Sequence, residues 1–245
     1  MANSHSSESY SLASEILYNI QESLFDRQSR EFLPATKIST LVTRSKIEGE
    51  LECNDRELVD WINQHGRKVF LAIVQSQLHP AKNSLEAINL LRSHNYSDEK
   101  FEADDRLDYS GGSQLMESRD LNCFPTRLWN NIKYKNFCQA KWILCTPIFD
   151  TEQDDYHLPA RAVLPFVEKD SHVTEGAFSN VYKARIHKDH ARHGHTEVTS
   201  QVALNCAFWV AAINRSDARP SYHTGRNQGD EAVRDSCRYR NTVWR

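Results

Sequence analysis

Apolar side chains recur at helical spacing through most of residues 11–92, and this pattern constrains the fold more than any other feature of the chain. The first such stretch spans 11–29, where an apolar residue returns every fourth position, at Leu12, Ile16, Ile20 and Leu24. This is the spacing of one face of an α-helix. We predict a helix over 11–29 that turns this face to a core, with Ser11 or Ser14 as its N-cap.

Further helix signals follow at short intervals. Pro34 is suited to the first turn of a second helix, for which Gly49 is a plausible stop. Asn54 and Glu57 resemble a capping box, which predicts a third helix ending near Gly66.

An apolar run from Val69 to Leu78 predicts a buried helix that Pro80 ends, and 84–92 predicts another short helix. Short breaks between amphipathic helices are typical of a bundle-like α domain. We interpret Trp61 as a core residue. The helical faces are expected to form the core of the domain, and binding of a partner protein through one of them is the alternative.

The next segment, 95–120, is acidic and polar, and we predict a solvated loop without the spacing of a calcium-binding loop. Residues 128–140 are compatible with a helix. Residues 141–149 are expected to be extended and buried, and 150–156 to form a second acidic connector. We therefore place an α-helical N-terminal domain at 1–150.

Composition excludes several classes of function. The net charge of −3 gives no electrostatic reason to expect nucleic acid or a membrane surface as a partner. No apolar run approaches the ~20 residues of a membrane span, and residues 1–10 lack the apolar centre of a secretory signal. The six cysteines have no C-x-x-C spacing, which favours reduced thiols. We expect an intracellular protein, cytoplasmic or nuclear.

The stretch 173–186 is the part of the chain that suggests a chemistry. It predicts two short strands joined by a tight turn, because Phe178, Val181 and Tyr182 favour strands while Gly176 favours the turn. A glycine here lets the backbone approach a phosphate closely. An ordinary hairpin turn is the alternative on this evidence alone.

The stretch resembles the glycine-rich loop of protein kinases, G-x-G-x-[FY]-[GS]-x-V. Thr174 stands at the first glycine, Gly176 at the second, Phe178 at the aromatic tip, Ser179 at the third glycine and Val181 at the valine that packs on adenine. The longer run 176–187 and the segment 164–168 resemble a group of filamentous-fungal protein kinase-like proteins, in which a helical region precedes the kinase lobe.

The resemblance implies a strand of the form V-A-[IL]-K, whose lysine contacts the nucleotide phosphates. Here that strand reads Val202-Ala203-Leu204-Asn205, so a neutral Asn205 replaces the lysine. The sequence contains no H-R-D-x-x-x-x-N and no D-F-G motif. We expect a kinase truncated within its small lobe, a pseudokinase without catalytic residues that does not transfer phosphate.

The expected fold is α+β: the helical domain, then a partial antiparallel sheet like a kinase N-lobe at 160–210, then a poorly ordered tail at 211–245. The resemblance implies ATP as cofactor, bound weakly or not at all. The implied contacts are Thr174, Gly176, Ala177, Phe178, Ser179, Val181, Ala203 and Asn205. The alternative is a non-enzymatic helical module that binds a protein partner and keeps a vestigial β-hairpin.

Four histidines lie close together, at His187, His190, His193 and His195. Imidazoles at such spacing can bind a metal, but no cysteine or carboxylate pattern completes the set. We predict a solvated polar turn between two strands and no metal site.

Overall fold

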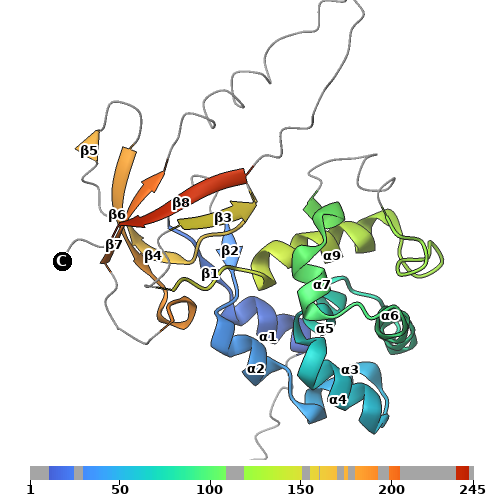
Figure 1. The fold of residues 1–245 in the computed structure, drawn as a ribbon. Coiled ribbons are helices and arrows are strands. Elements are labelled where there is room, and N and C mark those ends of the chain that lie inside the picture. Colours follow the sequence, from blue (N-terminus) through green and yellow to red (C-terminus); the bar gives the residue numbers. More distant parts are fainter. Residues whose placement is uncertain are drawn as a thin grey trace, which may run out of the picture.

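The computed structural model describes residues 11–24, 30–108, 119–150, 155–159, 161–169, 174–175, 180–192, 199–204 and 236–242. Within these ranges the chain is an α+β protein. Helices dominate residues 12–144, and an antiparallel sheet is built from strands between 155 and 242, as Figure 1 shows.

The first helix, α1, spans Leu12–Asn19 and begins at Ser11, whose hydroxyl accepts a hydrogen bond from the backbone N–H of Ser14. The prediction of a helix as far as residue 29 is wrong. Ile20 is already extended, because the next residues form β1 (Gln21–Glu22), which pairs with β2 (Glu31–Phe32). Sheet pairing therefore ends a helix that the apolar periodicity would have continued.

The next three helices are α2 (Ala35–Leu41), α3 (Arg44–Leu51) and α4 (Arg56–His65). Gly49 does not stop a helix as predicted, since it lies inside α3. Glu52 ends α3 instead, in a left-handed conformation with φ of 47°. The cap of α4 is Asp55, one residue after the predicted Asn54, and the helix ends at Gly66 as expected.

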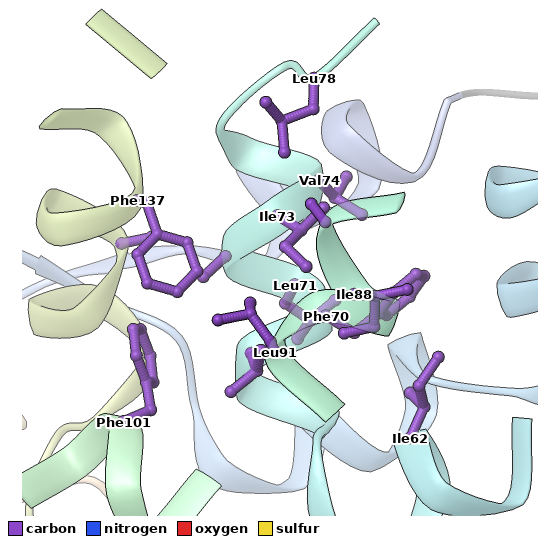
Figure 2. Packing of buried hydrophobic residues seen from close by; sticks show 14 of the residues in the cluster. Ile62, Phe70, Leu71, Ile73, Val74, Leu78, Ile88, Leu91, Phe101 and Phe137 are labelled. Carbon is purple, nitrogen blue, oxygen red and sulfur yellow. The ribbon is translucent and has the colours of Figure 1, made fainter. Parts of the chain in front are cut away.

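Helix α5 (Arg67–Gln75) is the centre of the helical core. Every residue from Val69 to Val74 is buried, and α5 packs against α1, α2, α4, α6, α7 and α9. Figure 2 shows α5 side chains converging with Ile88 and Leu91 of α6 (Ala81–Ser93) and with Phe101 and Phe137. A helix that is apolar on all sides is buried on all sides, which confirms the prediction for 69–74.

In its described part, 95–108, the acidic segment 95–120 is not the solvated loop that its composition predicted, while 109–118 lie outside the described residues. It contains α7 (Asp98–Ala103) and a 3-10 turn, η1 (Asp105–Asp108). Asp98 accepts hydrogen bonds from the backbone N–H groups of Lys68 and Val69 at 2.9 and 3.0 Å, so it caps the start of α5. Phe101 is fully buried against Phe137.

Helix α9 (Asn131–Leu144) is capped by Asn130, and its residues Tyr134 and Phe137 join an aromatic cluster in the core with residues that precede the helix. Phe124, Trp129, Tyr134 and Phe137 contact one another with ring centroids 5.1 to 5.3 Å apart. The predicted extended stretch 141–149 is wrong over its first part, because Lys141 to Leu144 form the last turn of α9.

The strands of the sheet are β3 (Asp155–Pro159), β4 (Phe166–Lys169), β5 (Thr174–Glu175), β6 (Asn180–Ile186), β7 (Thr199–Leu204) and β8 (Ser236–Thr242). Their order is β3-β8-β7-β6-β4, and β5 also pairs with β6. A small second core supports the sheet, formed by Phe149, Tyr156, Phe166, Ala184 and Ile186.

Two further sequence expectations need correction. The predicted connector 150–156 already enters β3 at Asp155. In the tail at 211–245, for which we predicted poor order, residues 236–242 form β8 and pair with both β3 and β7, while 211–235 and 243–245 lie outside the described residues. None of the described helices combines the length and apolar composition that crossing a lipid bilayer would require.

Candidate functional site

The stretch that suggested a chemistry forms one β-hairpin in the structure. Strand β5 pairs with the first half of β6, with Thr174 opposite Val181 and Glu175 opposite Asn180. Strand β4 pairs with the other end of β6, where Phe166 lies opposite Ile186. The two short strands therefore make up one arm of a hairpin whose second arm is β6.

The Val-Ala-Leu segment lies directly beside this hairpin. Strand β7 pairs with β6 in antiparallel register, so that Val181 is the Cα partner of Ala203 and Asn180 that of Leu204. Because Val181 also partners Thr174, these three residues stand in one row across β5, β6 and β7. Directly opposed residues in antiparallel strands have Cα atoms about 4.5–5.5 Å apart. Three of the predicted site residues are therefore brought together.

The remaining predicted site residues lie outside the described residues: Gly176, Ala177, Phe178, Ser179 and Asn205. Residues 176–179 connect the Glu175–Asn180 pair, and Asn205 directly follows the last residue of β7.

Strand β8 adds residues to this row that no pattern in the sequence predicted. Arg240 is the Cα partner of Ala203, and its partner on the other side is Asp155 of β3. A position with a basic residue thus stands next to the Val-Ala-Leu strand β7. No local motif predicts this, because more than 30 residues separate β7 and β8 in the chain.

The histidine turn has a different structure from the one predicted. It contains the 3-10 turn η2 (Lys188–His190), which follows β6. His190 is buried, and its ring contacts that of Phe32 with centroids 5.4 Å apart. Burial lowers the pKa of His190 to about 4. The prediction of a solvated turn is therefore wrong for His190.

Both ring nitrogens of His190 already have partners. Nε2 accepts a hydrogen bond from the backbone N–H of Ala35 at 3.2 Å, and Nδ1 lies 3.1 Å from the carbonyl oxygen of Pro147. Among the described residues, no three histidine, cysteine or acidic side chains gather as metal ligands would. His193 and His195 lie outside the described residues.

Comparisons of the chain with known protein families, with curated proteins and with solved structures found no match.

Proposed function

We propose that residues 166–204 form a kinase-like nucleotide-binding hairpin that holds Mg-ATP weakly and does not transfer phosphate. The observation that supports this proposal is the row formed by Thr174, Val181 and Ala203. The resemblance to the glycine-rich loop requires a hairpin at 173–186 with the Val-Ala-Leu strand beside it. A helix at 173–186, or a distant β7, would have been incompatible with it.

The absence of phosphate transfer follows from the residues that the sequence contains. Kinases use an aspartate of the catalytic loop as base and the aspartate of D-F-G to hold Mg²⁺, and neither motif occurs in the 245 residues. Asn205 has no charge with which to bind phosphate. Arg240 is the Cα partner of Ala203, and a guanidinium is a strong phosphate ligand.

Thermal unfolding with and without Mg-ATP tests the proposal. A ligand that binds only the folded state raises the melting temperature. We expect a rise of a few degrees at millimolar Mg-ATP for the wild type, and no rise for Gly176→Asp, which places a carboxylate where phosphate would lie. Gly49→Asp is the matched control, because Gly49 has open space around it on α3, and it should keep the shift. The absence of a shift in the wild type would contradict the proposal.

A second candidate is a non-enzymatic helical interaction module, and exposed apolar residues favour it. On α1, Leu12 and Ile16 are buried, whereas Leu17 and Tyr18 are 68% and 91% exposed. A contiguous exposed apolar patch often marks a site of protein binding, and Leu17 and Tyr18 are successive residues of α1. This candidate predicts that Leu17→Ser with Tyr18→Ser abolishes copurification of a partner without lowering the melting temperature. Loss of fold, or unchanged copurification, would count against it.

A further inference from the structure

His190 lies where the helical region meets the turn between β6 and β7. Its side chain is only 2% exposed. Nε2 receives the N–H of Ala35, the first residue of α2, and Nδ1 contacts the carbonyl oxygen of Pro147, which follows α9. One imidazole thus joins three segments of the chain that are far apart in sequence.

The donor and acceptor groups in these two contacts determine which ring nitrogen of His190 carries the proton. A backbone N–H can only donate and a backbone carbonyl can only accept. His190 must therefore be the neutral tautomer with its proton on Nδ1. Protonation of Nε2 would place two N–H groups against each other and remove the contact with Ala35. A buried donor left without an acceptor costs about 1–3 kcal/mol.

Other contacts hold the same turn to the helical region. The hydroxyl of Thr36 in α2 donates a hydrogen bond to the carboxylate of Asp189. The N–H of Phe149 donates to the carbonyl of His190 at 2.7 Å, and the N–H of Arg192 donates to the carbonyl of Phe149 at 2.8 Å. These backbone bonds make a short parallel bridge between Phe149 and Ala191.

The turn that makes these contacts lies between two paired strands of the sheet. It directly follows β6, the second arm of the hairpin, and precedes β7, the strand beside it. We propose that the turn is a coupling joint, in which the hydrogen bond from Ala35 to His190 links α2 to the hairpin. Loss of this hydrogen bond then increases local opening of β6 and β7. The joint depends on this contact and not on nucleotide binding.

Hydrogen–deuterium exchange of the full chain at neutral pH tests the joint with two variants whose amide groups each replace one ring nitrogen. In His190→Asn the amide nitrogen replaces Nδ1, which keeps the contact with Pro147 and removes the one with Ala35. In His190→Gln the amide oxygen can replace Nε2, which keeps the acceptor for Ala35. We expect exchange in peptides covering 180–192 and 199–204 to become about tenfold faster in His190→Asn. It should change much less in His190→Gln, while α5 keeps its protection in both.

His65→Asn is the control, because His65 is an exposed residue in the last turn of α4. It should leave exchange in the sheet at the wild-type rate. Three results would overturn the joint: unchanged exchange of β6 and β7 in His190→Asn, equal acceleration in the Asn and Gln variants, or equal acceleration in α5 and the sheet. The last result would show a general loss of stability in place of a local coupling.

Discussion

The phenol of Tyr96 donates a hydrogen bond of 2.7 Å to the carboxylate of Asp104, and both side chains are buried. Arg106 completes the arrangement, because its Nε and one terminal nitrogen bind the two oxygens of the same carboxylate at 2.8 and 2.9 Å. Burial alone would raise the pKa of Asp104, but the hydrogen bonds from Arg106 and Tyr96 hold it below its usual value. These hydrogen bonds link the segment after α6 to the segment after α7.

Tyr96→Phe should therefore destabilise the protein by about 2 kcal/mol, since a hydrogen bond to a charged group contributes about 1.5–3 kcal/mol. Urea unfolding followed by circular dichroism measures the change. Tyr18→Phe is the matched control, because Tyr18 is 91% exposed, and its unfolding free energy should stay within about 0.5 kcal/mol of wild type. Equal stability of the two variants would show that the Asp104 contact contributes nothing.

Two glycine-to-alanine substitutions should change stability in opposite directions. A Cβ on Gly66 would lie 2.6 Å from the indole of Trp61, whereas a Cβ on Gly49 meets nothing within 4 Å. Gly66→Ala should cost about 1–3 kcal/mol through overpacking. Gly49→Ala, inside α3, should add about 0.5–1 kcal/mol of helix propensity. Melting temperatures that move in the same direction for both variants would contradict this assignment.

His190 should give the protein a specific sensitivity to acid. Burial lowers its folded-state pKa to about 4. The charges of His187 in the same turn and Lys68 in α5 also oppose its protonation, while the hydrogen bond with Pro147 and the charge of Asp189 favour it. In the unfolded chain the pKa of a histidine is about 6.5. Below that pH the unfolded state therefore binds a proton that the folded state does not.

Stability should accordingly be highest above pH 6.5 and fall between pH 6.5 and about 4, by up to about 3 kcal/mol from this residue. Burial lowers the pKa of His187 as well, so the wild type should be compared with His190→Gln, which retains His187. Unfolding free energies at pH 7 and pH 4.5 measure the effect. The wild type should lose more stability than the variant, and equal losses would mean that His190 titrates normally.

The sequence predicted parts of the helical core correctly where the local signal was strong. Residues 69–74 and the end of α4 at Gly66 are examples. The predictions were wrong where a contact between residues far apart in the chain overrode the local sequence pattern. The end of α1 depends on the pairing of Gln21 with Phe32, and α7 exists because Asp98 caps α5 and Phe101 fills the core. No window of neighbouring residues contains these contacts.

The candidate site shows the same division. The hairpin and the strand beside it were predictable from strand-forming residues around one glycine and from the kinase resemblance. The partner of Ala203 in β8 was not, because the intervening chain carries no periodic pattern. The burial of His190 was missed for a related reason. Four histidines among charged residues predict solvent exposure, whereas His190 contacts Phe32 and Ala35, which are more than 150 residues away in the chain.

Calorimetric titration of the full chain with Mg-ATP tests the central claim most directly. We predict saturable binding at one site for the wild type and for Gly49→Asp, and no measurable binding for Gly176→Asp. An absence of binding to the wild type at millimolar Mg-ATP, or equal affinity in Gly176→Asp, would contradict the assignment of the hairpin as a nucleotide site.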